Sequence, residues 1–395
     1  MRPRLVLFGA GNIGRSFIGQ IFARGGYEVV FVDIDARLVR ELNRRGRYEV
    51  IIAHPDGRES TLPVEGVRAV DANDREAVEH ELVDASIAAT AVGAAALSPV
   101  AGLIRAGVER RRRERPGSPL DVILAENVHD AAAIVERTLA GGSDGAANRS
   151  TVGLVETSIG KMVPIVPPEI AARDPLLVYA EPYNTLIVDA RGFRGSVPQL
   201  HDLHPVDDIR AYVDRKLYLH NLGHAAVAYE GFRYAPGISL IAEAVELAPV
   251  RSATHAAMTE SLAALAAAHP EAFDRTALEE NRDDLLARFA NRALGDTLYR
   301  VGRDLPRKLG RDDRVVGAMR LAAAHDLPFD AIAGVYRAAL GFAATDPTGE
   351  PYPADLTVVE LAREHGPAAV LRQVSGLDDS DAVDARVAER VLARR

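Results

Sequence analysis

Three residues near the middle of the chain, Lys216, Asn221 and His224, carry an amine, a carboxamide and an imidazole, groups that transfer protons or hold an oxygen. They fall in the apolar-rich segment 207–231, whose pattern predicts one helix opened by two aspartates. At about 100° per residue, Lys216 and His224 would lie roughly 80° apart, with Asn221 roughly 60° beyond His224. The side chains would therefore fan over one side of the helix, and the long lysine stem would close the remaining gap. The alternative is a half-buried helix that carries three polar residues without chemistry.

The same segment offers a pair of histidines, His220 and His224, at the spacing that can bind a metal on one helix face. In zinc-protease helices a glutamate follows the first histidine, whereas here that position is Asn221. The chain also has no cysteine. We therefore expect no catalytic metal.

A glycine-rich turn near the start of the chain follows the apolar run 5–8 and precedes a helical pattern. Glycines in such a turn allow a tight bend and close approach to a pyrophosphate, which sits at the helix N-terminus. The next predicted strand, 28–32, ends at an acid, where hydrogen bonds from ribose hydroxyls are accepted. A structural glycine turn is the alternative. The candidate cofactor-binding residues of this unit are Gly9, Ala10, Gly11, Asn12, Ile13, Gly14 and Asp33.

The acid predicts the identity of the cofactor. A carboxylate at Asp33 would repel the 2′-phosphate of NADP and would accept hydrogen bonds from the free ribose hydroxyls of NAD. Arg37, one helical turn further on, would permit some use of NADP. We therefore expect NAD as the cofactor.

Two later strands end in residues that would also face a ligand, because side chains beyond the carboxyl ends of parallel strands line the crevice. The strand 86–92 closes with Thr90, Ala91, Val92 and Gly93, where Gly93 would let the chain pass close to the cofactor or would simply end the strand. The strand 121–125 is followed by Asn127, which would donate its amide to a bound oxygen or cap a helix over 130–139.

The order of elements predicts an α/β protein, a Rossmann-type dinucleotide-binding domain followed by a mainly α-helical substrate domain. We expect an NAD-binding domain with extra strands over residues 1–195 and a helical catalytic domain over 196–395. Within these domains, the pattern predicts one strand over 64–70 and a helix over 285–298. The basic run 110–113 reads as the solvated end of a helix.

Composition narrows the classes of function. The 395 residues have a net charge of −9, which argues against a general nucleic-acid binder. The N-terminus enters a strand-like run directly, and no apolar stretch of membrane-spanning length occurs, so we expect a cytoplasmic protein with no membrane partner. The expected partner is a small molecule, and the expected state is a monomer or small homo-oligomer.

Several motifs together are similar to the polyol-specific long-chain dehydrogenase family over nearly the whole chain. The Lys-x4-Asn-x2-His pattern at 216, 221 and 224 is the most specific of them, because in that family it supplies the catalytic residues. The other matching motifs are Phe8-Gly-Ala-Gly-Asn-Ile-Gly-Arg15, Thr90-Ala-Val-Gly93, Glu126-Asn127, Val301-Gly-Arg-Asp304, Arg307-Lys-Leu309, Gly366-Pro367 and Val374-Ser-Gly-Leu-Asp378.

The resemblance implies NAD-dependent, metal-independent hydride transfer between D-mannitol 1-phosphate and D-fructose 6-phosphate. Lys216 would be the general base if its pKa, near 10.4 in free lysine, is lowered by burial or a neighbouring cation. Asn127 and Asn221 would hold the developing oxyanion, and His224 would orient the substrate. The alternatives are a non-phosphorylated polyol or hexuronate dehydrogenase of the same family, such as mannitol 2-dehydrogenase or fructuronate or tagaturonate reductase, and a non-catalytic dinucleotide sensor.

A phosphate on the substrate would need fixed positive charge beyond the catalytic helix. The densest basic segment of the second half is 300–314, and its turn at 306–310 would aim Arg307 and Lys308 inward, with Arg303 nearby. The alternative is that these cations form ion pairs with the acids of the same segment, Asp304, Asp312 and Asp313.

Overall fold

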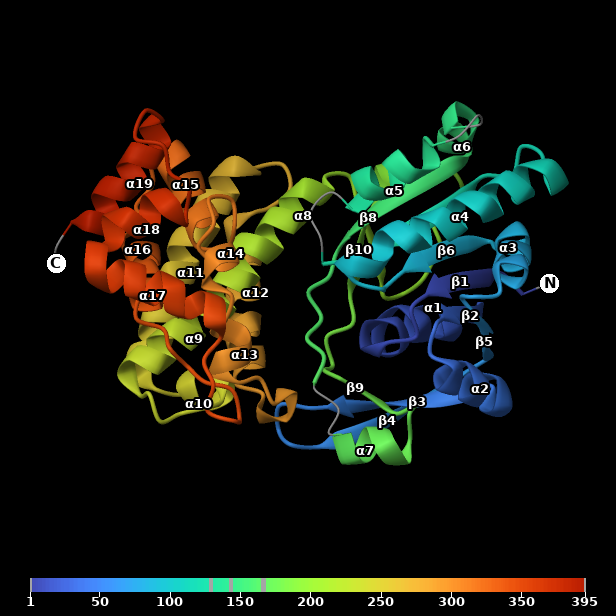
Figure 1. The fold of residues 1–395 in the computed structure, drawn as a ribbon, viewed down its shortest axis with the longest axis horizontal. Helices are drawn as coiled ribbons and strands as arrows, with labels where there is room; N and C mark the ends of the chain where they lie inside the picture. Colours follow the sequence, from blue (N-terminus) through green and yellow to red (C-terminus); the bar gives the residue numbers. More distant parts are fainter. Residues whose placement is uncertain (1, 128–130, 142–144, 165–167, 394–395) are drawn as a thin grey trace. The chain divides into compact units, whose positions relative to one another are not determined.

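The computed structural model describes residues 2–127, 131–141, 145–164 and 168–393. The chain divides into two compact units, the first made of Met1–His54 and Arg58–Ile209, the second of Pro55–Gly57 and Arg210–Arg395. Each unit has its own secondary structure and is described separately below (Figure 1).

The first unit contains an eight-stranded sheet with the order β11-β10-β8-β7-β6-β1-β2-β5. All neighbouring strands in it are parallel except β10, which runs antiparallel to β8. The central strands are almost wholly buried and apolar, as strands covered on both faces are. The strands of this sheet are β1 (Arg4–Phe8), β2 (Glu28–Asp33), β5 (Val67–Asp71), β6 (Ile87–Thr90), β7 (Leu120–Leu124), β8 (Val152–Ser158), β10 (Leu186–Asp189) and β11 (Leu203–Val206).

Helices cover the sheet of the first unit on both faces (Figure 1). Successive residues of β1 point to opposite faces, so Leu5 and Leu7 join one apolar core while Val6 and Phe8 join the other. The chain leaves β1 for β2 on one side and returns to β6 on the other, which creates a switch point of the kind where α/β sheets bind ligands. The helices are η1 (Gly14–Gly19), α1 (Gln20–Arg24), α2 (Ala36–Arg45), α3 (Arg75–Asp84), α4 (Ala94–Glu114), α5 (Ala131–Leu139), α6 (Gly145–Thr151), α7 (Pro168–Arg173) and η2 (Ala190–Gly192).

A second, three-stranded sheet with the order β4-β3-β9 packs into one of these cores. Its strands are β3 (Arg47–Ala53), β4 (Glu59–Glu65) and β9 (Val178–Ala180). The single strand predicted over 64–70 is wrong, because Gly66 adopts φ +73° and separates β4 of this sheet from β5 of the larger one. A left-handed residue turns the backbone out of one sheet and into the next.

The second unit is helical in its described residues (Figure 1). Its long central helix α11 packs against α9, α12, α15 and α16. The helix predicted over 285–298 is wrong: α12 ends at Phe289, and Asn291 then accepts the backbone N–H of Ala293 to open a short 3₁₀ turn. The helices are α8 (Ile209–Arg215), η3 (Lys216–Asn221), α9 (Leu222–Tyr234), α10 (Ile241–Ala244), α11 (Ala248–Ala268), α12 (Arg275–Phe289), η4 (Arg292–Leu294), α13 (Leu298–Gly302), α14 (Leu305–Lys308), α15 (Val316–Ala324), α16 (Asp330–Ala339), α17 (Pro353–His365), α18 (Pro367–Gln373) and α19 (Ala382–Leu392).

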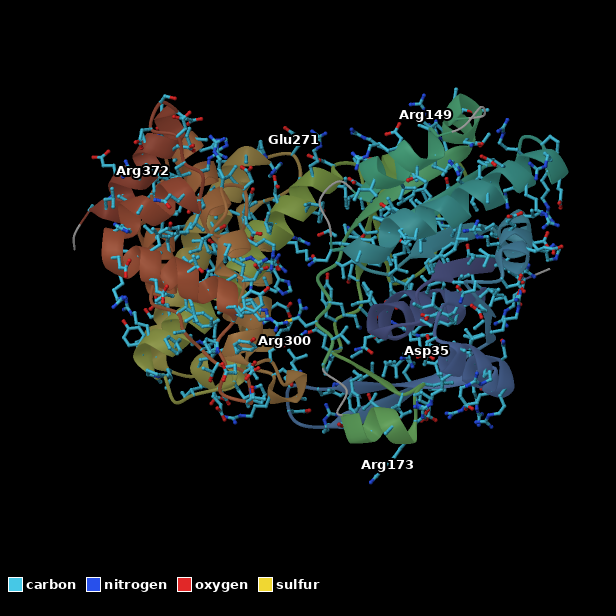
Figure 2. The ribbon with its side chains drawn as sticks, viewed as in Figure 1. Asp35, Arg149, Arg173, Glu271, Arg300 and Arg372 are labelled. Carbon is cyan, nitrogen blue, oxygen red and sulfur yellow. The ribbon has the colours of Figure 1, made fainter. Side chains whose placement is uncertain are left out.

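The α/β prediction, a Rossmann-type domain followed by a mainly helical domain, is therefore confirmed. Exposed charged side chains such as those of Arg149, Arg173, Glu271 and Arg372 project outward (Figure 2). No helix in the described part of the chain combines the length and apolar character that a bilayer crossing needs.

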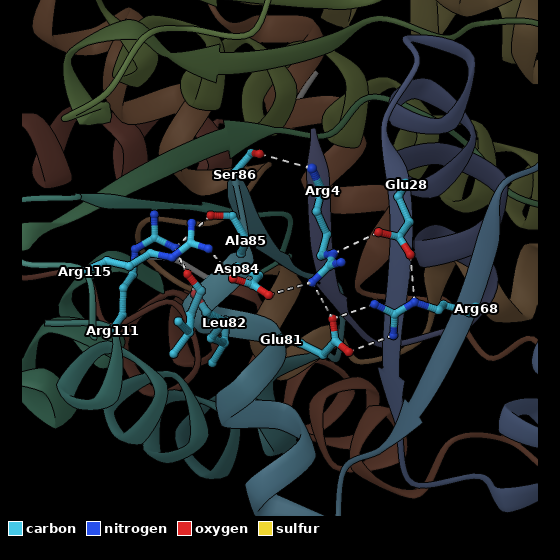
Figure 3. Close-up of polar contacts among 11 residues, drawn as sticks. Arg4, Glu28, Arg68, Glu81, Leu82, Asp84, Ala85, Ser86, Arg111 and Arg115 are labelled. Atoms are coloured by element: carbon cyan, nitrogen blue, oxygen red, sulfur yellow. Dashed lines mark hydrogen bonds and ion pairs between the residues drawn. The ribbon is translucent and has the colours of Figure 1, made fainter. Parts of the chain in front are cut away.

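One basic residue expected in solvent is instead buried. Arg111 on α4 donates Nη1 hydrogen bonds to the carbonyls of Leu82, Val83 and Ala85, at the C-terminal end of α3 (Figure 3). Those carbonyls have no partner within their helix, and a cation there also matches the helix dipole. The run 110–113 is thus only partly a solvated helix end, and Arg111 is a structural cap.

The amino-terminal edge of the large sheet carries a network of ion pairs (Figure 3). Arg68 binds Glu81 through two nitrogens at 2.8 and 2.7 Å and binds Glu28 through Nε at 2.8 Å. Arg4 reaches Glu28 at 2.9 Å and Glu81 at 3.1 Å. These residues tie β1, β2, β5 and α3 together at the edge opposite to the glycine turn, so they serve the scaffold rather than the site.

Candidate active site

The glycine turn of the first unit joins β1 to η1 by a path that larger residues would block. Gly9 has φ +95°, and a Cβ there would lie 2.4 Å from the carbonyl oxygen of Ala91. A Cβ at Gly14 would lie 2.0 Å from the carbonyl oxygen of Gly9. Gly11 differs, because among the described residues, its own chain neighbours aside, no atom lies within 4 Å of its Cβ position. Gly9 and Gly14 are therefore required by packing, whereas Gly11 leaves open space beside the backbone.

Asp33, the last residue of β2, lies directly beside this turn. Its Oδ2 accepts the backbone N–H of Ala10 at 2.6 Å, and its Oδ1 accepts that of Asp35 at 2.9 Å. The carboxylate is thus held in one orientation at the edge of the turn. Arg37 points elsewhere, since its Nη2 donates to the carbonyl of Ala172 at 3.0 Å. Of the remaining turn residues, Ala10 is buried, Ile13 is half-buried and Asn12 is exposed.

The segment after β6 packs against the same turn. Thr90 is buried, Ala91 donates to the carbonyl of Phe8 at 2.8 Å, and Val92 lies 3.1 Å from the Cβ position of Gly9. Gly93 has φ +79° and is the N-cap of α4. The first unit therefore brings residues 9–14, 33 and 90–93 together around one turn.

Glu126 holds this segment in place and had no role assigned from the sequence. Its Oε1 accepts the N–H of Val92 at 2.9 Å and its Oε2 accepts the N–H of Gly93 at 2.7 Å. The feature of the sequence that could have indicated this role is the position of Glu126 directly after a buried strand and before Asn127. Asn127 itself is exposed in a bend after β7. Residues 128–130, where the predicted helix over 130–139 would start, lie outside the described residues, and α5 begins at Ala131.

In the second unit, Lys216 and Asn221 are the first and last residues of a π-helix that continues α8 into α9. Hydrogen bonds in a π-helix run from i to i+5, so the α-helical angles assumed for these side chains do not apply. Such insertions are frequent at functional sites. Gly223, two residues after Asn221, lies close to α11, because a Cβ there would lie 2.6 Å from the sulfur of Met258.

The amine of Lys216 is in a strongly desolvated environment. Burial, and then the positive charge of Arg314, lower the pKa of Lys216 to about 8. A lysine with this pKa is neutral in roughly a fifth of the molecules near physiological pH, far more often than a free lysine. Arg314, the last residue of the basic segment 300–314, is held by Asp313 through an Nε–Oδ1 contact of 2.7 Å.

His224 is a neutral histidine with a fixed ring. Burial lowers the pKa of His224 to about 3, and Arg300 and Lys308 add to this effect. Its ring stacks on that of Phe289, with centroids 4.7 Å apart. Its Nε2 lies 3.5 Å from Oδ2 of Asp296, is buried, and makes no hydrogen bond to a described residue. A buried polar atom in this state is suited to bind a ligand hydroxyl.

A narrow gap lies next to His224, with no room for a water-sized molecule. Its lining is His224, Leu240, Ile241, Ala242, Phe289, Asn291, Arg292, Leu294, Gly295 and Asp296. The neighbouring His220 also has a pKa well below its ordinary value, chiefly through burial. The part of the chain that the structure describes contains no group of three or more histidines and acids that could hold a metal ion.

The three residues proposed for phosphate have different environments. Arg307 is exposed and pairs with Asp304 at 2.6 Å and Asp313 at 3.4 Å, which is the ion-paired arrangement considered as the alternative. Arg303 is exposed, with its guanidinium 5.3 Å from the ring centroid of Tyr299. Neither environment singles out a phosphate site.

Lys308 is the buried cation of this segment. Its Nζ donates to the carbonyl of Val301 at 2.5 Å and to that of Arg303. Burial, and then the charges of Arg314 and Arg307, lower the pKa of Lys308 to about 7. Asp355 fixes the preceding turn, because it accepts the N–H of Leu305 at 2.6 Å and that of Asp304, which adopts φ +74°.

The parallel sheet, the glycine turn and the acid after β2 define a dinucleotide-binding α/β protein with an appended helical unit. The chain belongs to the mannitol dehydrogenase family: residues 3–202 match the mannitol dehydrogenase Rossmann domain and residues 208–393 match the mannitol dehydrogenase C-terminal domain. The resemblance inferred from the motifs is confirmed.

Curated relatives cover most of the chain. A mannitol-1-phosphate 5-dehydrogenase from Brevibacillus brevis is 36% identical over 79% of this chain and 79% of its own length. One from Bacillus subtilis is 32% identical over 97% of this chain and 98% of its own length.

Two solved structures share the fold. A substrate-free D-sorbitol dehydrogenase has a TM-score of 0.81 at 18% identity, covering 99% of this chain and 92% of that one. Mannitol 2-dehydrogenase from Pseudomonas fluorescens, a ternary complex with NAD and D-mannitol, has a TM-score of 0.71 at 15% identity, covering 99% and 91%. At these identities the comparison supports the fold alone.

Proposed function

We propose that this protein is an NAD-dependent dehydrogenase that interconverts D-mannitol 1-phosphate and D-fructose 6-phosphate. The observation that carries the proposal is the similarity, over nearly the whole chain, to mannitol-1-phosphate 5-dehydrogenases, together with a Lys216 whose pKa lies near 8. The first unit is assigned cofactor binding, and the second unit is assigned the base.

The residues of the glycine turn fit NAD. Gly11 leaves space for close approach of a pyrophosphate, and the oriented carboxylate of Asp33 suits free ribose hydroxyls. When bound, NAD supplies the ring carbon that accepts the hydride. The residues around Thr90, Ala91, Val92 and Gly93 form the adjoining wall of this turn.

Lys216 is proposed to take the hydroxyl proton as the substrate carbon is oxidised. Its lowered pKa supports this role, because a general base works best when its pKa lies near the working pH. Asn221 and Asn127 are assigned to the substrate oxygen on which negative charge develops. His224 is assigned to orienting a substrate hydroxyl, since its neutral ring is fixed and its buried Nε2 lacks a hydrogen bond to the described residues.

The phosphate of the substrate requires a cation, and Lys308 is now the first choice among Arg303, Arg307 and Lys308. An ammonium has three N–H donors, and two of those on Lys308 are directed at backbone carbonyls. The third is assigned to the substrate phosphate. A phosphate dianion nearby would also raise the pKa of Lys308 and keep it charged.

The proposal is tested by following NADH absorbance with mannitol 1-phosphate and with free mannitol, each with NAD and with NADP. The expected result is a preference of orders of magnitude for mannitol 1-phosphate, with NAD favoured over NADP. Equal efficiency on free mannitol would assign the chain to a non-phosphorylated activity of the family. NADH binding without turnover of any polyol would favour a dinucleotide sensor.

A further inference from the structure

One buried carboxylate in the first unit binds two consecutive backbone amides beside the cofactor turn. Glu126 lies two residues beyond β7 and is only 7% exposed. Its two oxygens accept the N–H groups of Val92 and Gly93 at 2.9 and 2.7 Å. Both donors belong to the neighbouring strand end, so this contact bridges two strand ends at the ligand-facing edge of the sheet.

The amides concerned stand at the start of a long helix. Gly93 is the N-cap of the 21-residue helix α4, and its own residue type provides no side-chain cap. The first amides of a helix lack intrahelical partners and attract anions. Glu126 therefore supplies the anion from within the protein, and it fixes the direction in which the chain leaves β6.

The clamped segment is also part of the wall around the glycine turn. The carbonyl oxygen of Ala91 and the side chain of Val92 are the nearest atoms to the Cβ position of Gly9. On its other side, Glu126 is followed directly by Asn127, the proposed ligand of the reacting oxygen. A movement of Glu126 would thus displace the cofactor turn and Asn127 together.

We propose that Glu126 is a positioning residue that couples the cofactor-binding wall at 91–93 to the oxygen-binding group at Asn127. It acts through these neighbours and does not touch the reacting atoms. The inference rests on the proposed dehydrogenase function, which assigns the two neighbours their roles.

The chain contains a matched control near the other end of β7. Asp121, near the opposite end of β7, is also buried, and its two oxygens accept the N–H groups of Arg194 and Gly195 at 2.7 and 3.0 Å. The chemistry is the same as at Glu126, but the clamp lies away from the ligand-facing edge. Asp121→Asn therefore measures what the loss of such a clamp does to the scaffold alone.

The experiment compares Glu126→Gln with Asp121→Asn and the wild-type chain. Glutamine keeps the size of the side chain, but only one of its two terminal atoms can accept, so one backbone amide loses its partner. We expect Glu126→Gln to weaken NADH binding, measured by NADH fluorescence, and to lower kcat, each by about tenfold, the scale of one charge-assisted hydrogen bond. The isotope effect with mannitol 1-phosphate deuterated at the oxidised carbon should rise. Asp121→Asn should lower only the midpoint of thermal unfolding.

Two outcomes would overturn the inference. One is a Glu126→Gln variant with wild-type NADH affinity and kcat; the other is one that resembles Asp121→Asn in losing only thermal stability. NADH binding needs no polyol substrate, so it decides the role of Glu126 in the cofactor wall even if the wild-type chain does not turn over mannitol 1-phosphate. In that case unchanged NADH affinity would still overturn the inference, whereas absent turnover in the wild type would overturn only the proposed function.

Discussion

The ring of His224 stacks face to face on the ring of Phe289, with the centroids 4.7 Å apart and the planes 8° from parallel. Phe289 is the last residue of α12 and is buried. The stack fixes the plane of the imidazole and removes it from water, which is consistent with the low pKa of His224. A second helix thus determines how His224, the histidine of the proposed catalytic motif, is presented.

Phe289→Leu should therefore reduce activity more than stability. Leucine preserves most of the apolar volume but leaves the imidazole free to tilt, so we expect kcat/KM for mannitol 1-phosphate to fall by roughly tenfold, as for one misoriented hydrogen bond. Phe329→Leu provides a control, because Phe329 is a buried aromatic at the start of α16 that contacts Arg390. Equal activity losses in the two variants would show that the stack has no special role.

Lys216→Ala should abolish turnover and leave NADH binding intact. Removing a general base typically costs about 10²–10⁴ in rate, while the cofactor turn belongs to the other unit. Steady-state rates and NADH fluorescence measure the two effects separately. Partial rescue by added amines at high pH would support the assignment of the base, and near-wild-type activity would refute it.

Lys308→Met should selectively impair the phosphorylated substrate. We expect kcat/KM for mannitol 1-phosphate to fall by at least about tenfold, because a buried charge-assisted contact is lost, with little change for free mannitol. Arg307→Ala should have a smaller effect, since Arg307 is exposed and paired with acids. Equal losses on both substrates in Lys308→Met would mean that Lys308 only holds the turn at 301–303.

Acid should destabilise the chain through its buried histidines. His224 has a folded pKa of about 3 against an unfolded value near 6.5, so the unfolded chain binds the proton first. Stability is then unaffected above about pH 6.5 and falls as the pH drops from there toward 3, by up to about 1.4 kcal/mol per pH unit for one histidine. In urea unfolding of His224→Gln, the free energy of unfolding should fall less steeply between pH 6 and pH 4 than in the wild-type chain. The difference in slope against pH should be roughly that amount. An unchanged slope would contradict the burial of a neutral ring.

The first unit was largely predictable because its signals are local. A buried strand, a glycine turn and an acid after the next strand lie within Leu5–Asp33, and each follows from short-range sterics and hydrogen bonding. The boundary at Gly66 was missed because the strands on either side of it, β4 and β5, pair in two different sheets. The φ of +73° at Gly66 follows from that division, which the local sequence does not show. Arg111 was read as solvated because its carbonyl partners come from another helix.

The candidate site was predictable in its motif residues but not in their environment. The Lys-x4-Asn-x2-His spacing was visible, whereas the π-helix that carries it was not, since the pattern of apolar residues fits an ordinary helix as well. Phe289, Glu126 and Asp355 act through partners between 33 and 65 positions away, and no local pattern marks such contacts. Arg307 and Lys308 are adjacent in sequence yet differ in burial, which only the packing of α14 decides.

The pH dependence of kcat/KM for NAD-dependent oxidation of mannitol 1-phosphate tests the central claim most directly. Lys216 must be neutral to accept the hydroxyl proton, and its pKa is about 8. The rate should therefore rise about tenfold per pH unit below pH 8 and level off above it. A rate that stays constant between pH 6 and 9, or a failure to reduce NAD with this substrate at any pH, would contradict the account.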